Sequence, residues 1–511
     1  MYYYNLGQFF SDVAHANAEQ TALCYLVQSY SYKKLNNTVE SIAQLLIKKG
    51  CCRGDVIAIG HNKHYLSYAL MLAALRLGIS YVNIDTASPQ ERNARILNVC
   101  ETKLLFCDSS EDFQSMTELA KEADCKFVMI NKVQLPELTD KEVLQQKKLM
   151  AKVDGSCIAY IMFTSGSTGI PKGVAVTHQN VLHFISWGQQ RFKISEQDNF
   201  ANLSPMYFDN SVFDFYIALF SGASLSPIHR ELLTSPYELI SYVKDMQCTI
   251  WFSVPSMLIY LKAMKAITAD ALPTLKHIIF GGEGYPKIEL KKLYDDFSRQ
   301  ADLVNVYGPT ECTCICSAYT ITDQDFDDME GLPALGTLNP NFDFKILDDQ
   351  DEKSDIGELC LIGPNVASGY YNDTIRTSAS FIELNDKNRY MKRMYRTGDL
   401  VREFDAKLYF LGRKDNQIKH MGYRIELEEI ETAVHTLPGI IQAAVIYKRV
   451  NTAFGKIFCY VQADSQFDKD NALIQLRKKL PDYMLPGNII VMDELPKNPN
   501  GKVDKKTLGD L

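Results

Sequence analysis

The sequence predicts an α/β protein with a large N-terminal part, made of two α/β subdomains and a set of barrel-like strands, and a small α+β part at the C-terminal end. Three observations predict this fold class. Strand-like apolar runs alternate with helical patterns up to about residue 330, shorter strands of alternating polarity follow, and the pattern changes once more near residue 417. A chain of 511 residues also exceeds the length at which one hydrophobic core usually divides into several domains.

The first subdomain is predicted from a regular alternation of short apolar strands and helices. VIAIG at residues 56–60 is a buried strand, a helix follows over 67–77, and SYVNID at 80–85 is the next strand. A second helix is expected to begin at Ser88, and LLFCD at 104–108 forms a third strand. This order is typical of βαβ units and of a parallel sheet.

The second subdomain repeats this rhythm after residue 158. Buried strands are predicted at residues 158–163, 249–255 and 277–283. Beyond about residue 330 the strands become shorter and alternate in polarity, as in FKILD at 344–348 and ELCLIG at 358–363. Such strands favour an antiparallel or barrel-like arrangement.

A compact module of strands and helices follows GRKDNQ at residues 412–417. It contains about 100 residues, which is a normal size for a small domain. We therefore predict a large domain at residues 1–414 and a small domain at residues 415–511.

Composition excludes several classes of function. The formal net charge of −8 and the isoelectric point near 5.7 argue against nucleic acid or an anionic membrane as a partner. The N-terminal residues lack the basic and apolar regions of a signal peptide, and the longest apolar stretch, at 68–82, carries Arg76 and is too short to span a bilayer. The 13 cysteines form no disulfide-like pattern. We expect a cytoplasmic protein.

TSGSTGIPKG at residues 164–173 is the most informative segment. An apolar strand leads into a loop of hydroxyls and glycines with one lysine, a composition that suits phosphate, because glycine N–H groups converge on an anion and Lys172 supplies a positive charge. The spacing is not that of a P-loop NTPase, and the loop alone would also fit a flexible turn. The predicted phosphate-binding residues are Thr164, Ser165, Gly166, Ser167, Thr168, Gly169 and Lys172.

Motifs further along the chain favour the phosphate interpretation. In NVYGPTE at residues 305–311, Tyr307 can stack on a base and Glu311 can bind Mg²⁺. In YRTGDL, Asp399 offers two oxygens to a ribose diol, and NPNGKVDKK places Lys502 on a glycine turn. Each residue alone has a structural explanation, such as a turn cap or a solvated lysine, but their joint occurrence in this order favours function.

These motifs identify a family resemblance over nearly the whole chain. The sequence resembles the adenylate-forming enzymes, above all the amino-acid adenylation domains of nonribosomal peptide synthetases and the D-alanine:carrier-protein ligases. The resemblance rests on YSYKKL (30–35), ALRLGISYVNID (74–85), TSGSTGIPKG, FDNS (208–211), FGGEGYP (280–286), NVYGPTE, GELCLIG (357–363), YRTGDL (395–400), GRKDNQIK (412–419), LPDYMLP (480–486) and NGK (500–502).

The resemblance implies a ligase with two half-reactions at one site. An amino acid's carboxylate attacks the α-phosphate of MgATP to give an aminoacyl-AMP and pyrophosphate. The thiol of a phosphopantetheinylated carrier protein then takes the aminoacyl group. It also implies that the barrel is distorted and that the small domain is mobile, turning about a hinge at Asp415.

The resemblance also assigns roles to individual residues. Lys502 is the catalytic residue, Glu311 the Mg²⁺ ligand, Asn305 and Tyr307 recognise adenine, and Asp399 binds the ribose hydroxyls. The nucleotide-binding residues beyond the phosphate loop are Gly282, Glu283, Asn305, Val306, Tyr307, Gly308, Pro309, Thr310, Asp399 and Arg413.

Asp209 indicates which acid is activated, since by resemblance it binds the substrate's α-ammonium, and a buried carboxylate is costly without such a charge. A helix cap is the structural alternative for this residue. The pocket has no charge and favours a medium aliphatic amino acid such as isoleucine or valine; Gly281 enlarges it where D-alanine ligases tend to have cysteine. Its expected residues are Asp209, Asn210, Phe213, Phe252, Ile279, Gly281, Val306, Cys314 and Ile315.

Three other functions remain as alternatives: a D-alanine:carrier-protein ligase, an acyl-CoA synthetase and a catalytically idle nucleotide-binding scaffold. Asp209 disfavours the acyl-CoA synthetase, and the intact Lys502, Glu311 and phosphate loop disfavour the scaffold. We expect a monomer, either a free-standing ligase or a domain of a longer synthetase.

Overall fold

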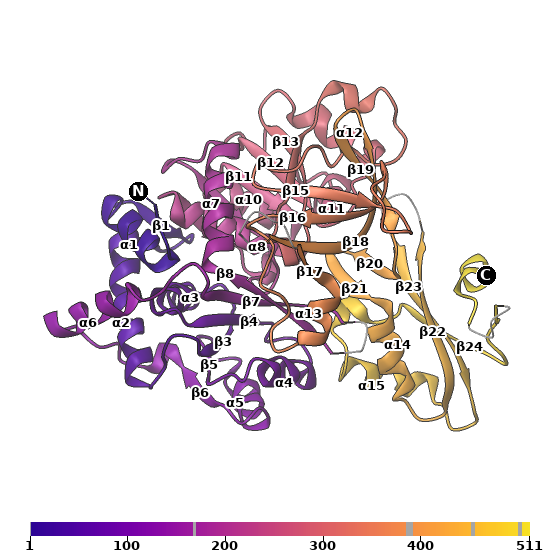
Figure 1. The fold of residues 1–511 in the computed structure, drawn as a ribbon, viewed down its shortest axis with the longest axis horizontal. Coiled ribbons are helices and arrows are strands. Elements are labelled where there is room, and N and C mark those ends of the chain that lie inside the picture. The colour runs from indigo at the N-terminus through magenta and orange to yellow at the C-terminus, as the bar shows by residue number, and fades with distance from the viewer. Residues whose placement is uncertain (1, 167–169, 385–391, 451–454, 499–502) are drawn as a thin grey trace.

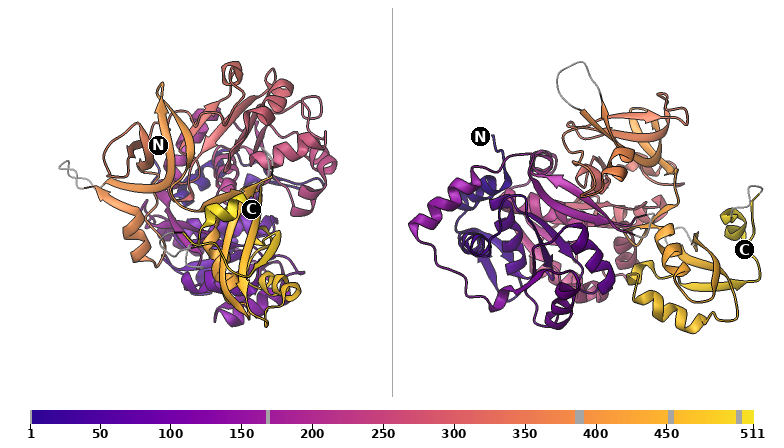
Figure 2. Two further views of the ribbon diagram at one scale, coloured as in Figure 1. Left: turned by 90° about the vertical axis from the view of Figure 1, so that its right-hand side faces the viewer. Right: turned by 60° about the horizontal axis from the view of Figure 1, so that its bottom comes forward.

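The computed structural model describes residues 2–166, 170–384, 392–450, 455–498 and 503–511. The large domain extends to the end of β19 at Arg413, and the small domain lies to one side of it (yellow in Figures 1 and 2). The predicted boundary falls between Arg413 and Gln417, where β20 begins.

A six-stranded sheet with helices on both faces forms the first subdomain. Its order is β6-β5-β3-β4-β7-β8, parallel except for the antiparallel pair β7 and β8. Successive side chains of β3 point to opposite faces, so Ile57 packs with α3 while Ala58 packs with α4 and α5. The strands are β3 (Val56–Gly60), β4 (Ser80–Ile84), β5 (Leu104–Cys107), β6 (Lys126–Met129), β7 (Ile158–Thr164) and β8 (Lys172–Thr177), and the helices are α1 (Leu6–Ala16), α2 (Tyr32–Lys48), α3 (Tyr65–Leu77), α4 (Gln90–Val99), α5 (Phe113–Glu122) and α6 (Asp140–Met150).

An eight-stranded sheet forms the second subdomain, in the order β14-β13-β12-β11-β9-β10-β1-β2. Trp251 faces the core beneath α10 to α12, whereas Phe252 faces the core shared with the first subdomain. The strands are β1 (Thr21–Cys24), β2 (Ser29–Ser31), β9 (Asn199–Asn202), β10 (Ser224–Pro227), β11 (Ile250–Ser253), β12 (His277–Gly281), β13 (Asp302–Tyr307) and β14 (Ser317–Thr320), and the helices are α7 (His178–Phe192), α8 (Asn210–Val212), α9 (Ala218–Phe220), α10 (Pro236–Asp245), α11 (Pro255–Ala263) and α12 (Lys287–Phe297).

Antiparallel strands complete the large domain, as expected for the residues beyond 330. The long strand β18 pairs with β16, with β17 over its first half and with β19 over its second half. The elements are β15 (Asp343–Leu347), β16 (Ile356–Ile362), α13 (Thr374–Ser380), β17 (Phe381–Leu384), β18 (Lys392–Phe404) and β19 (Lys407–Arg413).

The small domain has a hydrophobic core of its own, which includes Ile425, Ile430 and Val461. A hairpin of β20 and β21 points toward the large domain, and β22, β23 and β24 form a separate sheet. The elements are β20 (Gln417–His420), β21 (Tyr423–Glu426), α14 (Leu427–His435), β22 (Ile440–Arg449), β23 (Gly455–Ala463), α15 (Lys469–Arg477), β24 (Asn488–Met492) and α16 (Lys505–Asp510).

The predicted elements are present, and prolines and glycines adjust their ends. Helix α4 begins at Gln90 rather than at Ser88, because the residue before Pro89 disfavours the helical conformation. Strand β11 ends at Ser253 because Pro255 opens α11, and β12 ends at Gly281 because Gly282 has a positive φ of 86°.

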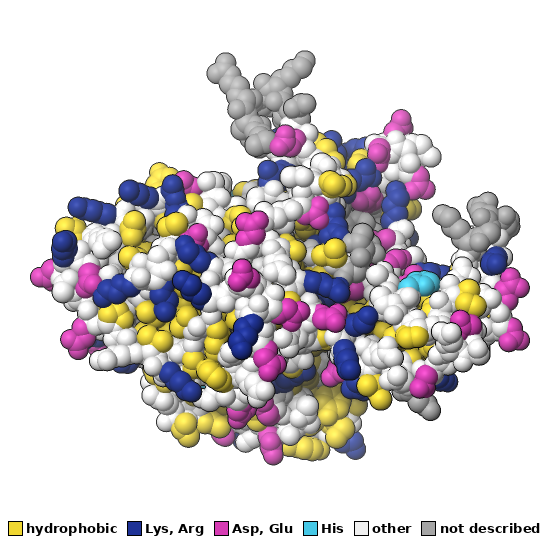
Figure 3. Space-filling model, turned by 90° about the horizontal axis from the view of Figure 1, so that it is seen from below, with side chains coloured by type: hydrophobic (Ala, Val, Ile, Leu, Met, Phe, Trp, Pro, Cys, Tyr) yellow, Lys and Arg dark blue, Asp and Glu magenta, His cyan; other side chains and the backbone are white. Residues whose placement is uncertain are grey.

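One face of the surface carries charged side chains of both signs, interspersed with apolar ones (Figure 3). Within the described ranges, no helix has both the length and the apolar character needed to cross a bilayer.

Candidate functional site

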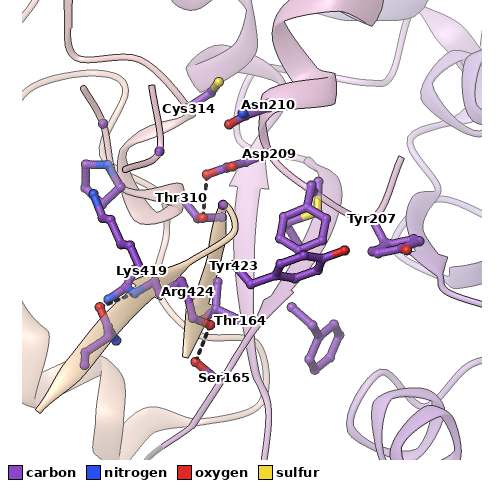
Figure 4. A pocket seen from close by; sticks show the side chains of 18 of the residues that line it. Thr164, Ser165, Tyr207, Asp209, Asn210, Thr310, Cys314, Lys419, Tyr423 and Arg424 are labelled. Atoms are coloured by element: carbon purple, nitrogen blue, oxygen red, sulfur yellow. Dashed lines mark hydrogen bonds between the residues drawn. The ribbon is translucent and has the colours of Figure 1, made fainter. Parts of the chain in front are cut away.

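The central cavity lies where strands of both subdomains end and where the small domain meets them. Its walls include Tyr307 at the end of β13. Thr164 at the end of β7 and Arg424 from the β20–β21 hairpin also line it (Figure 4). Its volume is about 90 Å³. In doubly wound α/β proteins, ligands bind at the carboxyl ends of the parallel strands, which makes this cavity the candidate active site.

The predicted phosphate loop, residues 164–172, joins β7 to β8. Thr164 lies opposite Lys172 in the strand pair, which holds the two ends of the loop together. A Cβ at Gly166 would lie 2.0 Å from the carbonyl oxygen of Ile170, so glycine is required for this close approach. Oγ1 of Thr164 is buried without a hydrogen-bond partner in the described part of the chain, and so remains available to a ligand. The predicted residues Ser167, Thr168 and Gly169 lie outside the described residues.

The small domain makes direct contacts with this loop. The Ser165 hydroxyl donates to the carbonyl of Arg424 at 2.8 Å and accepts from the backbone N–H of Glu426 at 3.1 Å. Nζ of Lys172 lies 3.2 Å from Oε1 of Glu426. The Ser165 hydroxyl and the Lys172 ammonium are therefore both engaged by strand β21.

Glu311 is fully buried, and both of its carboxylate oxygens have partners. The Tyr370 hydroxyl donates to Oε1 at 2.8 Å, and Nη1 of Arg424 donates to Oε2 at 2.7 Å. Burial alone would raise the pKa of Glu311, but Arg424 and Lys172 lower it to about 2. The carboxylate is therefore ionised and charge-paired.

An ionised carboxylate of this kind fits Mg²⁺, which prefers oxygen ligands and often takes one or two carboxylates together with substrate phosphates. Glu311 would hold the ion when Arg424 is displaced. The described residues contain no group of three or more His, Cys, Asp or Glu side chains that could hold a metal.

Asp399 and Arg413 form a second polar group that lines the cavity. The Tyr307 hydroxyl donates to Oδ2 of Asp399 at 2.6 Å, and Nη1 of Arg413 donates to Oδ1 at 2.6 Å. Arg413 also binds both carboxylate oxygens of Asp415, each at 2.6 Å. The predicted ribose and hinge residues are thus linked through one guanidinium.

Two predicted nucleotide residues have their polar groups engaged within the protein. The Asn305 amide donates to the carbonyl of Ala334 at 2.8 Å. The Glu283 carboxylate accepts from the N–H of Ser256 at 2.7 Å and from that of Gly422 at 3.0 Å, which ties the large domain to the small one. Neither side chain lines the central cavity, whereas Gly282, Val306, Gly308, Pro309 and Thr310 do.

Asp209 lies in the cavity wall just before α8, and it makes no capping hydrogen bond to that helix. Instead it accepts from the Thr310 hydroxyl at 2.6 Å (Figure 4). Burial raises its pKa, the Thr310 hydrogen bond opposes this, and the nearby Glu311 carboxylate adds to it, with a net upward shift. A carboxylate in this setting gains from a cationic ligand.

The side-chain pocket next to Asp209 has uncharged walls, namely Asn210, Phe252, Val306, Cys314 and Ile315. Cys314 has a positive φ of 73°, a conformation rarely adopted by residues other than glycine and often found at functional sites.

Three other predicted pocket residues lie behind these walls. The Phe213 ring packs edge-on against Phe252 with centroids 5.4 Å apart, and Ile279 pairs with Phe252 in the sheet. Gly281 pairs with Val306, and a Cβ at Gly281 would lie 2.4 Å from the Val306 carbonyl oxygen. A larger residue at 281 would therefore press on Val306 before it reached the cavity.

Several cavity residues were missed by sequence reasoning. Arg92 comes from α4, and Lys419, Tyr423 and Arg424 come from the β20–β21 hairpin. The signal for the last three was present, because they follow GRKDNQ directly in a basic and aromatic run. Arg92 carries no local signal, since its role depends on contacts with the distant small domain.

Comparisons with known proteins agree with this geometry. Residues 10–371 match the sequence model of the family described as AMP-binding enzyme, and residues 429–502 match that of the AMP-binding enzyme C-terminal domain. The chain is 32% identical over 510 residues to surfactin synthase subunit 2 of Bacillus subtilis, with 98% of this chain but only 14% of that protein covered.

Two shorter relatives are covered over most of their length. An L-proline--[L-prolyl-carrier protein] ligase of Pseudomonas fluorescens is 31% identical, with 96% of this chain and 95% of that ligase covered. A D-alanine--D-alanyl carrier protein ligase of Bacillus licheniformis is 30% identical, with 89% and 88% covered. Overall identity therefore does not separate the amino acids named for these relatives.

The fold is that of a solved structure described as the Vibrio cholerae adenylation domain AlmE in complex with glycyl-adenosine-5'-phosphate. The TM-score is 0.84 at 24% identity, and the match covers 100% of this chain and 98% of that one. The predicted two-part α/β fold is confirmed.

Proposed function

Because the chain belongs to the AMP-binding enzyme family, we propose that it activates an amino acid with ATP and transfers the aminoacyl group to the phosphopantetheine thiol of a carrier protein. The observation that carries this proposal is the position of the Asp209 carboxylate. It lies in the cavity wall beside the phosphate loop and makes no capping hydrogen bond to α8. An α-ammonium group supplies the positive charge that this carboxylate requires, and fatty or aryl acids do not.

The first half-reaction brings two anions together. An oxygen of the substrate carboxylate bonds to the α-phosphorus of ATP, the bond from that phosphorus to the bridging oxygen breaks, and pyrophosphate leaves. Lys172 and the donors of the phosphate loop would hold the β- and γ-phosphates, and Lys502, outside the described residues, would stabilise the developing charge. Mg²⁺ held by Glu311 would neutralise the phosphate oxygens.

The nucleoside is proposed to lie along Tyr307 and Asp399. Asp399 now accepts hydrogen bonds from Tyr307 and Arg413, and it would exchange them for bonds from the ribose hydroxyls. Asn305 and Glu283 remain predicted nucleotide-binding residues. Because their side chains are engaged within the protein, we propose that the nucleotide contacts mainly the backbone next to them.

The side chain of the substrate is proposed to be medium and aliphatic, such as that of isoleucine or valine. Phe252, Val306 and Ile315 offer apolar contact, and Cys314 adds a thiol that burial keeps protonated by raising its pKa. These four side chains carry no charge that could pair with a charged substrate side chain. Discrimination between neighbouring aliphatic side chains is expected to be modest, since one methylene changes binding by about 1–3 kcal/mol.

The second half-reaction needs a path for the phosphopantetheine arm. A second cavity of about 130 Å³, lined mainly by apolar atoms, reaches Met421 and shares four lining residues with the central cavity, namely Phe208, Asn210, Gly422 and Tyr423. The thiolate would attack the acyl carbon through this passage, and the bond to AMP would break.

A D-alanine:carrier-protein ligase is the principal alternative, because one such ligase covers most of this chain. An acyl-CoA synthetase would leave Asp209 without a charge partner. An idle scaffold would not require an intact Glu311 and Lys502. We further expect a cytoplasmic monomer with no membrane or nucleic-acid partner.

The decisive experiment is amino-acid-dependent exchange of labelled pyrophosphate into ATP, across the twenty L-amino acids and D-alanine. Stimulation by branched aliphatic amino acids supports the proposal. Stimulation by D-alanine alone favours the alternative ligase, and no stimulation by any amino acid would contradict amino-acid activation altogether.

A further inference from the structure

Two glutamates of the small domain lie on the phosphate loop. Oε2 of Glu429 accepts the backbone N–H of Gly166 at 3.1 Å, and Oε1 of Glu426 lies 3.2 Å from Nζ of Lys172. The backbone around Glu426 also engages the Ser165 hydroxyl. In each case an anionic or polar group of the small domain meets a donor that the loop would present to a phosphate.

Glu429 has a second, buried partner in the large domain. Its Oε1 is bonded to Nη1 of Arg92, and the two residues are 4% and 9% exposed. Charge-paired residues at this depth hold each other strongly, because separating them would leave both charges uncompensated. The pair joins α14 of the small domain to α4, with 337 residues of separation along the chain.

Arg424 completes the pattern, since its guanidinium binds the Glu311 carboxylate at 2.7 Å. The segment from Arg424 to Glu429 thus presents one cation to Glu311 and two carboxylates to the phosphate loop. Magnesium pyrophosphate would present the same charges to the same groups. Because like charges repel, a pyrophosphate bound at the Gly166 N–H and the Lys172 ammonium would compete with the two glutamates for these groups.

We propose that Glu426 and Glu429 compete with the β- and γ-phosphates, and with the released pyrophosphate, for the phosphate loop. This inference rests on the proposed function, and it makes the two glutamates positioning residues. They hold the small domain in its present orientation only after pyrophosphate has left. Pyrophosphate therefore disfavours this orientation, and the thioester step waits for its departure.

The test is calorimetric binding of imidodiphosphate, a hydrolysis-resistant pyrophosphate analogue, in the presence of Mg²⁺. Wild type is compared with Glu429→Gln and with the matched control Glu428→Gln, which changes the same charge on the same helix where the side chain meets Asn416 and Lys505 instead. Removing the competing carboxylate should tighten binding by about ten-fold in Glu429→Gln, in the usual range of coupling between sites. Glu428→Gln should match wild type.

A gain in affinity is informative because a merely structural defect would weaken binding. Equal affinity in wild type and Glu429→Gln would overturn the inference, and so would an equal gain in Glu428→Gln. If Glu429→Gln does not fold, Glu426→Gln takes its place with the same expected gain.

A second measurement follows single-turnover transfer from preformed aminoacyl-AMP to a pantetheine thiol. Glu429→Gln should slow this transfer while retaining pyrophosphate exchange, and unchanged transfer would contradict the positioning role. Wild type that exchanges pyrophosphate but shows no effect of these variants would refute this inference alone. Wild type that binds neither imidodiphosphate nor ATP would refute the proposed function as well.

Discussion

At the scale of single residues, Asp209 is the residue that we propose to select an amino acid as the substrate. Its carboxylate accepts a hydrogen bond from Thr310 and has a pKa raised by burial. Asp209→Asn should lower kcat/KM for amino-acid activation on the order of 10²-fold or more, because the buried ammonium loses its partner.

Pyrophosphate exchange measures this loss, and Asp214→Asn is the matched control. Asp214 is also buried, and burial raises its pKa to about 8, opposed by its hydrogen bond from Asn202, so it is largely neutral at pH 7 and asparagine resembles it. If the two variants lost activity equally, Asp209 would have only a structural role.

Lys502 is predicted to act in the first half-reaction. Lys502→Ala should reduce adenylate formation on the order of 10²-fold or more, because the charge between two approaching anions acts mainly in the transition state. Transfer from preformed aminoacyl-AMP should change much less. Lys506→Ala serves as the control, because Lys506 is exposed. If Lys502→Ala slowed both half-reactions equally, this result would argue against the assigned role.

Gly281 shows how a substrate prediction depends on packing. A Cβ there would lie 2.4 Å from the Val306 carbonyl oxygen and 2.6 Å from its Cγ2 atom. Gly281→Ala should therefore lower the free energy of unfolding by about 1–3 kcal/mol, the usual cost of overpacking. Denaturant unfolding checks this against Gly487→Ala, whose nearest neighbour would be 3.8 Å away. If Gly281→Ala left the free energy of unfolding unchanged, β12 and β13 would have to move apart at this pair at little cost.

At the scale of elements, the link between β19 and β20 is the predicted hinge. Arg413 holds the Asp415 carboxylate, and Asp415 accepts the N–H of Gln417 at 3.2 Å. Asp415→Pro would fix φ near about −65° and so prevent rotation at this residue. We expect pyrophosphate exchange to persist while carrier loading becomes much slower.

Single-turnover rates of the two half-reactions test the hinge. Asp415→Ala separates the effects, because it removes the ion pair with Arg413 but leaves the backbone free to rotate. Carrier loading by Asp415→Pro at the wild-type rate would exclude a hinge at this position.

At the scale of the whole molecule, ligand binding should be measurable as stability. The small domain has its own core and meets the large domain around the cavity, so a ligand there contacts both (Figure 1). A non-hydrolysable aminoacyl-adenylate analogue at 100 times its Kd should add about 2.7 kcal/mol to stability.

Thermal unfolding with isoleucyl, valyl, alanyl and D-alanyl analogues compares how well each side chain fits the pocket. The two branched side chains should raise the unfolding midpoint most, because the walls are apolar and uncharged. A larger shift with the D-alanyl analogue would favour the alternative ligase.

Local pattern was sufficient for much of the fold. Apolar runs separated by helical patterns predicted β3, β4, β7 and β12. Successive side chains of such a strand point to opposite faces of the sheet, and both faces are covered by helices, so nearly every residue of the run is apolar. The ends were less predictable, as at Gln90, where Pro89 delays the helix. Strand pairing such as that of β9 between β10 and β11 joins distant segments and has no local signal.

The sequence by itself determined the family, the two-part architecture and part of the set of side chains at the cavity, since these follow from local composition and motif order. Only the tertiary structure decided how those side chains are paired. Glu283 accepts a hydrogen bond from the backbone N–H of Gly422, and Arg92 forms an ion pair with Glu429. Both contacts join segments more than a hundred residues apart. The physical reason is that burial and charge pairing depend on which surfaces meet, and no local pattern records which distant segment will cover a given strand end.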